Sequence, residues 1–590
     1  MSSDKIVEER EKVETTTRID DLINQHRAIF QAIFDENFDR QGKYKNSVLR
    51  NPLSDQKIEL LLTTSVTNLL EKENYLFETL GGKAPVHKAD EVGMVRFVAE
   101  SGYKNQPFKV ALRTTPLHSA ALISCEIDRL AVIRDLFEIY NEVYPNYICT
   151  FGLGLGLTHF HAACMCGLDN VVEKFLARSN YRERYQYPNL VWQRTGDSPL
   201  HMAIKYETTC EILLNRGADP NCANWAGSTP LHVICTIADD CGRVERFFEI
   251  NDANNQPLRV NARDARGNTP LLLALKKMRR QVAQVAAYLL RRGADPNLAD
   301  EDGSTPLHVI CRRASGHELL HWFLEVSDSR WPRQRLRVNA MDRWGRTPLG
   351  WAVASLLPDV VGALLDRLAD DDLSGFVFPS EEDFWLFTRW PHKHPALHKL
   401  TLVSSALAVI EMLEDKGFLM ELIDAVAIMK FFNKHKVFNY RADLVEGLSS
   451  NEKFKKKAGK ITVKGNLSYY EFLQLCPKRA AKRVKCVEFF NFVKSDRLRK
   501  LWKKNKTANF MYLSEKLLRV FCFTWAPTSF FLLSHRMPIE ICEMIVKSLM
   551  NQDLCNITLA TEDPSLVDSS ENVEDVNQIL DLRIRRPVEP

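Results

Sequence analysis

The sequence predicts an all-α protein whose middle, residues 91–372, is a solenoid of stacked helix pairs with inserted loops. Three observations lead to this prediction. A short phrase recurs seven times, glycines stand at fixed places between the copies, and apolar residues on both sides of the repeated region are spaced by three and four. The chain has 590 residues, more than one hydrophobic core supports, so several folding units are expected.

The recurring phrase has the form Thr-Pro-Leu-His, and its copies begin 43, 40, 31, 40, 36 and 42 residues apart. Thr or Ser can cap a helix, Pro suits the first helical position, Leu points into the core, and His is expected to hydrogen-bond within or between repeats. The pattern resembles the ankyrin repeat, whose period of about 33 residues implies insertions in most of these units. The copies begin at Thr115, Thr158, Ser198, Thr229, Thr269, Thr305 and Thr347.

Glycines stand where such a repeat needs a left-handed backbone. Gly217 and Gly293 follow the second helix of their repeats and should end it. Four further glycines precede a first helix at hairpins where a positive φ is needed: Gly227, Gly267, Gly303 and Gly345. One repeat cannot bury its own apolar face, so stacked neighbours should share a continuous core.

Two insertions, Asn251 to Arg259 and Ser327 to Arg337, fall between a second helix and the next hairpin and are expected to project from one side of the stack. An exposed Trp among arginines suits a protein-binding hot spot; the alternative is a solvated loop whose Trp folds back on its own repeat. We predict that Trp331→Ala weakens target binding by more than about 1 kcal/mol and leaves folding nearly unchanged. The candidate target contacts are Trp225, Arg330, Trp331, Arg333 and Arg335.

The positive charge of the chain is concentrated in one segment. Residues 451–506 carry 18 Lys and Arg against 4 Asp and Glu, a net +14, which leaves −10 for the rest of a chain of net +4. The phrase Pro477–Lys485 resembles a single-cluster nuclear-import signal, and the alternative is a basic helix face that docks on the acidic remainder. We expect a cytoplasmic protein, or a nuclear one if the phrase acts in import. No recognised motif accompanies the charge, so no nucleic-acid partner is expected.

The amino-acid composition indicates the cellular compartment in which the protein is expected. The 14 cysteines include no CxxC pair and predict reduced, mostly buried thiols of an intracellular protein. The polar, acidic first residues do not form a secretory signal. The most apolar stretch, Val520 to Leu533, is shorter than the roughly 20 residues of a membrane span and contains Pro527. We therefore expect a buried helix pair there and no membrane partner.

Three motifs resemble chemical sites. His317 to His321 matches the HExxH zinc-protease motif but lies where a repeat needs its second helix. The cluster of His392, His394 and His398 is flanked by prolines and predicts a loop, and Gly152 to Gly156 predicts a hairpin turn rather than a phosphate loop. We therefore expect no catalytic residue, metal or cofactor, and no enzyme, with a zinc protease as the third-ranked alternative function.

Helical patterns flank the repeats. In the N-terminal region, residues 1–90, they run from Ile19 to Phe34 and from Ile58 to Leu80, and could cap the solenoid. In a connecting region, 373–465, they run from Ala396 to Leu413 and from Met420 to His435. A C-terminal domain, 466–562, should follow, and then an acidic tail, 563–590, which we expect to be disordered.

The end of the C-terminal domain predicts a helical hairpin. Pro538 can start a helix on which Ile541, Ile545 and Leu549 form one apolar stripe, and a second short helix begins at Asp553-Leu554. The spacing Pro-x-Glu-Ile-x3-Ile-x3-Leu-x3-Asp-Leu resembles the start of an F-box, truncated after Ala560.

Repeats followed by a truncated box resemble the PRANC proteins of poxviruses and parasitoid wasps. The wasp members are the closer likeness, over roughly residues 150 to 562, and share the phrases GADPNLA, VNARD, WAVASLLPDVV and IMKFF. Met537 departs from the pattern, which usually has Leu there. The resemblance implies that the box binds the Skp-type adaptor of cullin–RING ubiquitin ligases. The implied adaptor-binding residues are Pro538, Glu540, Ile541, Ile545, Leu549 and Leu554.

The leading functional hypothesis is thus a substrate-recruiting subunit of an SCF-type ubiquitin ligase, whose ankyrin repeats bind an unknown protein target. The alternative is a non-catalytic ankyrin scaffold or inhibitor that binds a signalling protein without ubiquitin. Exposure of the stripe at Ile541, Ile545 and Leu549 separates the two hypotheses. Burial of the stripe against residues 466–530 would favour the scaffold.

Overall fold

The computed structural model describes most of the chain from residue 89 onward. The described residues are 89–100, 103–104, 114–140, 146–150, 152–178, 187–237, 241–277, 282–313, 316–330, 336–368, 373, 375–384, 395–438, 452–495, 498, 506–534, 537–562 and part of 58–69, which is helical. Several predictions lie outside them: the helix at 19–34, the end of the helix at 58–80, His392 and His394, Trp331, Arg333 and Arg335, and the tail 563–590.

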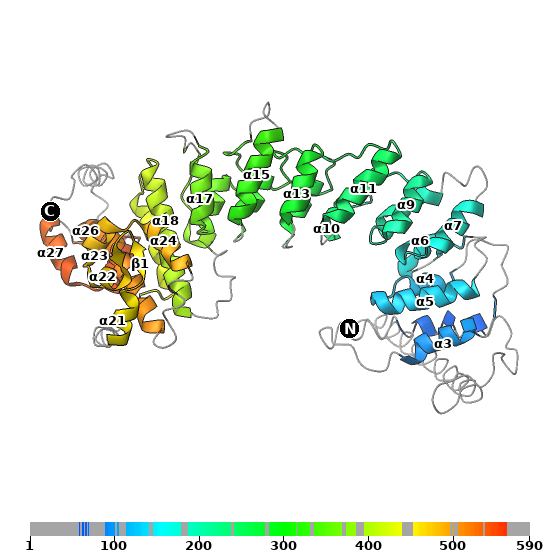
Figure 1. Ribbon diagram of the computed structural model, residues 1–590, viewed down its shortest axis with the longest axis horizontal. Helices are drawn as coiled ribbons and strands as arrows, with labels where there is room; N and C mark the ends of the chain where they lie inside the picture. Colours follow the sequence, from blue (N-terminus) through cyan, green and yellow to red (C-terminus); the bar gives the residue numbers. More distant parts are fainter. Residues whose placement is uncertain are drawn as a thin grey trace, which may run out of the picture. The chain divides into compact units, whose positions relative to one another are not determined.

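The chain forms two compact units, Met1–Ala294 (unit 1) and Asp295–Pro590 (unit 2). Unit 1 contains α3 (Ala89–Glu100), which packs on α5, and a row of helix pairs (Figure 1). The pairs are α4 (Pro116–Ala120) with α5 (Glu126–Ile139), α6 (His159–Met165) with α7 (Asp169–Arg178), α8 (Pro199–Ala203) with α9 (Glu207–Asn215), α10 (Pro230–Ile237) with α11 (Gly242–Ala253), and α12 (Pro270–Lys276) with α13 (Val282–Arg291). Two 3-10 turns are η1 (Gly152–Gly154) and η2 (Tyr187–Asn189).

The recurring phrase begins the first helix of each pair. At Thr158 and Ser198 the hydroxyl accepts the backbone N–H three residues on, at 3.2 and 3.4 Å, which satisfies a donor that the first turn leaves unpaired. Each first helix packs on the next within the unit, and the phrase leucines, such as Leu117 and Leu200, are fully buried. The predicted cap and core roles are confirmed here.

The predicted left-handed glycines are also confirmed. Gly217 and Gly293 end their second helices at φ 89° and 98°. Gly227 and Gly267 in unit 1 have φ 70°, and Gly303 and Gly345 in unit 2 have φ 74° and 72°. Side chains rarely adopt this conformation, so glycine fixes where each helix pair ends and where each hairpin turns.

Unit 2 begins with two more helix pairs, α14 (Pro306–Cys311) with α15 (Gly316–Arg330) and α16 (Pro348–Ala354) with α17 (Pro358–Leu365). The remaining elements are α18 (Pro395–Asp415), α19 (Leu422–Lys434), α21 (Glu452–Ala458), β1 (Thr462–Lys464), β2 (Leu467–Ser468), α22 (Tyr469–Gln474), α23 (Pro477–Arg483), α24 (Cys486–Lys494), α26 (Lys506–Leu533), α27 (Ile539–Ser548) and α28 (Asn551–Ala560). The two strands form a small antiparallel hairpin with Thr462 opposite Ser468.

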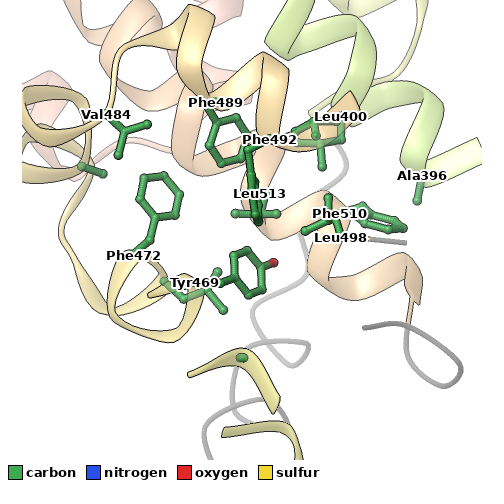
Figure 2. Packing of buried hydrophobic residues seen from close by; sticks show 14 residues of the cluster. Ala396, Leu400, Tyr469, Phe472, Val484, Phe489, Phe492, Leu498, Phe510 and Leu513 are labelled. Atoms are coloured by element: carbon green, nitrogen blue, oxygen red, sulfur yellow. The ribbon is translucent and has the colours of Figure 1, made fainter. Parts of the chain in front are cut away.

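One aromatic-rich core holds the C-terminal helices together. The rings of Phe472 and Phe489 stack at 5.2 Å between centroids, and those of Tyr469 and Phe492 lie 5.6 Å apart. Figure 2 shows these side chains in one interior with Leu400 of α18. The predicted division between a connecting region and a C-terminal domain at residue 465 is therefore not a structural boundary, because α18 supplies part of the same core and packs along α24 and α26.

The two predicted insertions are partly helical. Asn251 is fully buried in α11 and Ser327 is buried in α15, so the extra residues first lengthen the second helix of the repeat. These helices have 12 and 15 residues, against 9 in α9 and 10 in α13. Buried side chains along the added turns explain why the helix continues where the sequence predicted a loop.

The apolar stretch Val520 to Leu533 belongs to one helix, α26, and not to the predicted helix pair. Pro527 lies inside the helix and removes one backbone hydrogen bond. Trp525, Ala526 and Pro527 are all buried, and α26 packs against α18, α27 and α28. This packing on several sides keeps the helix continuous despite the lost bond.

Two helical stretches among the described residues, Ala396–Asp415 in α18 and Phe510–Leu533 in α26, are long and apolar enough to cross a membrane by length and composition. Of their most apolar windows, 67% and 50% are buried inside the protein. The two helices pack against each other, which accounts for their composition as core helices.

Candidate protein-interaction surfaces

Helix α27 carries two apolar stripes, and only one of them is used in packing. Cys542 and Val546 are fully buried under α26. On another face Ile541, Met544 and Ile545 are 39%, 60% and 36% exposed. Their spacing of three and four places them on one face of the helix. Just past the helix end, Met550 is also half exposed. We call Ile541, Met544, Ile545 and Met550 the α27 stripe.

The predicted adaptor-binding residues are only partly brought together. Pro538 and Glu540 are exposed at the start of α27, and Leu549 is half-buried at its end. Leu554 is fully buried in α28, which packs against α26 and α19, so its inclusion in a binding face was wrong. Its position in the second helix of the hairpin turns it inward, toward the core that holds the hairpin in place.

The connection between α27 and α28 is fixed by side chains of α26. The guanidinium of Arg519 donates to the carbonyl oxygens of Lys547, at 2.9 Å, and of Leu549, at the end of α27. The amide Nδ2 of Asn551 donates to Glu515 Oε2 at 2.6 Å and to the Glu515 carbonyl at 2.8 Å. A cation at the last carbonyls of a helix is favourable because these oxygens have no partner in the helix. The α27 stripe is therefore held on a rigid support.

Glu515 is the one acidic member of this cluster of side chains. Burial raises the pKa of Glu515 to about 7, although the hydrogen bond from Asn551 and the charge of Arg519 act in the opposite direction. The carboxyl group is thus partly protonated near neutral pH and lies directly beside the support of the α27 stripe.

Of the predicted target contacts, Trp225 is the one whose side chain is described. It is 66% exposed at a hairpin tip in unit 1. Arg330 is the last residue of α15, and its side chain lies outside the described residues. The same holds for the whole of Trp331, Arg333 and Arg335, so the hot spot predicted for that loop stays a prediction.

Two of the motifs that resemble chemical sites occupy ordinary repeat positions, while His398 of the third lies in α18 and not in the predicted loop. His317, Glu318 and His321 are exposed on α15, the second helix of its pair. At the predicted hairpin turn, Ile148 and Thr158 pair as an antiparallel bridge, and Gly156, at φ 78°, donates its N–H to the Cys149 carbonyl at 2.9 Å. Among the described residues, no group of three or more His, Cys, Asp or Glu side chains is placed to hold a metal.

The basic segment forms helices and the small hairpin. Part of its charge pairs with acidic side chains on other helices of unit 2. Lys485 contacts Asp415 of α18 at 2.9 Å, and Lys494 pairs with Asp359 of α17. The phrase predicted as an import signal forms α23, with Lys478, Arg479, Lys482 and Arg483 exposed. The predicted docking on acidic residues thus applies to some of the basic side chains.

Sequence reasoning missed several exposed apolar residues. Met544 lies three residues after Ile541, a spacing that could have identified it as part of the stripe. Leu153 and Leu155 lie in the glycine-rich turn and are 60% and 46% exposed, while Met341 and Trp344 are exposed in unit 2. No periodic signal marks residues in such turns, because a turn has no repeating face.

Comparison with known proteins identifies the repeats. Residues 207–300 and 278–374 match the family model for ankyrin repeats in three copies. The human transient receptor potential cation channel subfamily A member 1 is 26% identical over 179 residues, which cover 30% of this chain and 15% of that protein. The zebrafish neurogenic locus notch homolog protein 1 is 35% identical over 117 residues, 20% of this chain and 4% of that protein. The neurogenic locus Notch protein of Drosophila melanogaster is 37% identical over 90 residues, 15% of this chain and 3% of that protein.

The match to the family model lies within residues 207–374. The chain spans less than a sixth of the length of these relatives. The comparisons show an all-α ankyrin-repeat fold, which is a protein-binding scaffold.

Proposed function

We propose that this protein recruits a target protein to an SCF-type ubiquitin ligase, with its ankyrin repeats holding the target and its C-terminal helices binding a Skp-type adaptor. The repeats supply the protein-binding part of this function. The adaptor part rests on the truncated F-box spacing of residues 538–554 and on one structural observation, the exposed α27 stripe. Catalysis would belong to other subunits of the ligase.

The α27 stripe supports adaptor binding because a helix that served only to close the core would have no need of a second apolar face. Cys542 and Val546 already supply the face that packs on α26. Exposed apolar groups that lie together mark interaction sites more often than scattered ones do. Aliphatic and methionine side chains on a fixed helix suit a groove in a helical partner, with anchors at spacings of three and four.

The alternative function is a scaffold or inhibitor that masks a signalling protein without ubiquitin. Burial of Ile541, Ile545 and Leu549 against residues 466–530 was the outcome expected from that alternative. Ile541 and Ile545 are more than a third exposed and Leu549 is half-buried, and the buried positions are taken by Cys542 and Val546. This exposure favours the adaptor over the plain scaffold.

The test is capture of a purified Skp-type adaptor by the full chain. Ile545→Asp places a charge in the centre of the α27 stripe and should abolish capture, because a carboxylate buried at an interface without a partner costs several kcal/mol. Ile423→Asp is the control, since Ile423 lies on α19 of the same unit, away from α27, and is 72% exposed, against 36% for Ile545. Failure of the unmodified chain to bind the adaptor, or equal binding by both variants, would refute the proposal.

A further inference from the structure

Three successive hairpin tips in unit 1 are tied into one continuous strip. Trp192 Nε1 donates to the Leu155 carbonyl at 3.0 Å, and Arg194 Nη1 donates to the Leu153 carbonyl at 3.1 Å. The next tip continues the strip, because the backbone N–H of Trp225 donates to the Thr195 carbonyl at 3.0 Å. Side chains on these tips therefore keep fixed relative positions along the row of repeats.

Trp225 is exposed and yet held in place. Its indole Nε1 donates to the Gln193 carbonyl at 2.9 Å, so the polar atom of the ring is already paired. Beneath it lies Gly196, where a Cβ atom would come within 2.7 Å of Trp225. The residue is thus fixed by one hydrogen bond from its ring, one from its backbone N–H and a close contact with Gly196, and the ring presents only apolar surface outward. A fixed aromatic side chain loses little conformational freedom on binding, which is a property of interface hot spots.

Exposed leucines and arginines lie along the same strip. Leu153 and Leu155 project from the first tip, and Arg194 from the second is bonded to the backbone of Leu153. Beyond Trp225, the N–H of Ala265 donates to the Ala226 carbonyl at 2.8 Å, which places exposed Arg266 beside the tip that carries the tryptophan. We call Leu153, Leu155, Arg194, Trp225 and Arg266 the tip strip.

The acidic residues of these hairpins accept hydrogen bonds from the hairpins themselves. Asp197 Oδ1 accepts a hydrogen bond from Asn224 Nδ2 at 2.7 Å, and Asp264 Oδ1 accepts the backbone N–H groups of Arg266 and Asn268. Among the described residues, neither Arg194 nor Arg266 lies within ion-pair distance of a carboxylate. The charge that the tip strip offers to a partner is therefore positive.

We infer that the tip strip is the docking site for an acidic segment of the target, one that carries apolar side chains among its Asp and Glu residues. This inference rests on the proposed target-binding function of the repeats. The apolar side chains of the segment would cover Trp225 and the two leucines, and its carboxylates would pair with Arg194 and Arg266. Bidentate pairing with carboxylates is a property of arginine, and both arginines lie next to apolar surface that excludes water when covered.

A single-stranded nucleic acid is the other polymer that pairs with arginines beside an aromatic ring. It fits the strip less well, because two of the three apolar members are leucines, which offer no ring for a base to stack on.

The test is selection of random short peptides displayed on phage against the immobilised full chain. The selected peptides should be rich in Asp and Glu together with Leu, Phe or Trp, and their binding should weaken as salt is raised. Trp225→Ala and Arg194→Glu should each weaken binding about fivefold or more, the factor that corresponds to a hot-spot contact. Exchanging the acidic residues of a selected peptide for lysines should restore binding to Arg194→Glu.

Two controls make the outcome decisive. Ile127→Ala removes an exposed apolar side chain on α5, away from the hairpin tips, and should leave binding unchanged. Melting curves would identify a variant that fails to fold, in which case Arg266→Glu replaces it. Selection of basic peptides or of none, equal binding by Trp225→Ala and the parent, or binding of a labelled oligouridylate that Trp225→Ala abolishes would each overturn the inference.

Failure of this inference can be told apart from failure of the adaptor proposal. Adaptor capture is measured on the same preparations, and Trp225→Ala should retain it. Ile545→Asp should lose the adaptor and keep the selected peptides. Peptide binding without adaptor capture would refute the ligase proposal and leave the tip strip as a docking site of a scaffold.

Discussion

The ring atom Nε2 of His232 lies 3.1 Å from the carbonyl oxygen of Asn268, so a side chain of one repeat is bonded to the hairpin backbone of the next. The other ring nitrogen, Nδ1, accepts the backbone N–H of Thr229 at 3.1 Å. A nitrogen that accepts cannot carry a proton, so the ring is neutral and donates through Nε2. The same pair of bonds occurs at His118, His161, His201 and His308.

This arrangement predicts loss of stability in mild acid. Burial lowers the pKa of His118 and of His161 from 6.5 to about 4, and it lowers the pKa of His201, His232 and His308. Between the pKa of a histidine in the unfolded chain, about 6.5, and its lowered pKa in the folded repeats, the unfolded chain binds protons that the folded repeats do not. The free energy of unfolding therefore falls as pH falls from about 6.5 toward 4. Urea unfolding followed at several pH values in this range would measure it.

A variant within the repeats separates the effect of the buried histidines from other causes of acid unfolding. The repeat that begins at Thr269 has Leu272 in the histidine position, so His161→Leu copies a solution that the chain already uses. The variant should lose about 1–3 kcal/mol of stability near neutral pH, since the partly buried carbonyl of Leu190 loses its donor, and should show a shallower dependence on pH. An identical pH dependence in parent and variant would contradict the assignment.

A second prediction compares two glycines in unit 2. Gly303 and Gly345 have nearly the same φ, 74° and 72°, so alanine at either should cost the left-handed penalty of about 1–2 kcal/mol. A Cβ atom at Gly303 would lie 3.0 Å from Asp342 Cα and 3.1 Å from Arg343 N, whereas nothing lies within 4 Å at Gly345. Gly303→Ala should therefore lose more stability than Gly345→Ala. Equal melting temperatures would show that the hairpins can move apart without cost.

The repeats could be predicted in detail because each feature has a local cause. The cap at Thr158 and the turn at Gly217 depend on residues a few positions apart, and a sequence shows such neighbours directly. The shared core of the C-terminal helices could not be found in this way. Leu400 and Phe472 are buried in one core across more than seventy positions of sequence, and no periodic pattern joins them.

The α27 stripe shows more clearly what a periodic pattern in the sequence cannot predict. Ile541 with Ile545 and Cys542 with Val546 have the same spacing of four, so periodicity identifies two apolar faces without saying which one is buried. The packing of α26 decides which face is buried. The same packing buries Leu554, which the family resemblance had implied to be part of the adaptor-binding face.

A third prediction concerns Arg519 as a positioning residue for the proposed adaptor site. Arg519→Ala removes the donors at the carbonyls of Lys547 and Leu549 and frees the end of α27. Bonds to a charged group contribute about 1.5–3 kcal/mol, so adaptor affinity should fall roughly tenfold or more, although Arg519 is not part of the α27 stripe. Arg519→Lys should recover part of the loss. Hydrogen exchange over residues 539–560 should rise in the alanine variant, and unchanged exchange and affinity would contradict the positioning role.

The last prediction is a dependence on pH that arises at Glu515. Burial raises the pKa of its carboxyl from the ordinary 4.5 to about 7, so between these values the folded chain holds a proton that the unfolded chain has released. The contribution of Glu515 to the free energy of unfolding therefore falls as pH rises from about 4.5 to about 7 and is constant above pH 7. This dependence is opposite in sign to that of the buried histidines.

Glu515→Gln separates the two effects, because the amide resembles the neutral acid and can still accept the hydrogen bond from Asn551. The variant should match the parent below about pH 5 and exceed it in stability above about pH 7, with the difference growing in between. Urea unfolding and hydrogen exchange over residues 539–560, measured on both proteins across this range, would test it. A variant less stable than the parent at about pH 8 would mean that the ionised carboxylate, paired with Arg519, is the stabilising form.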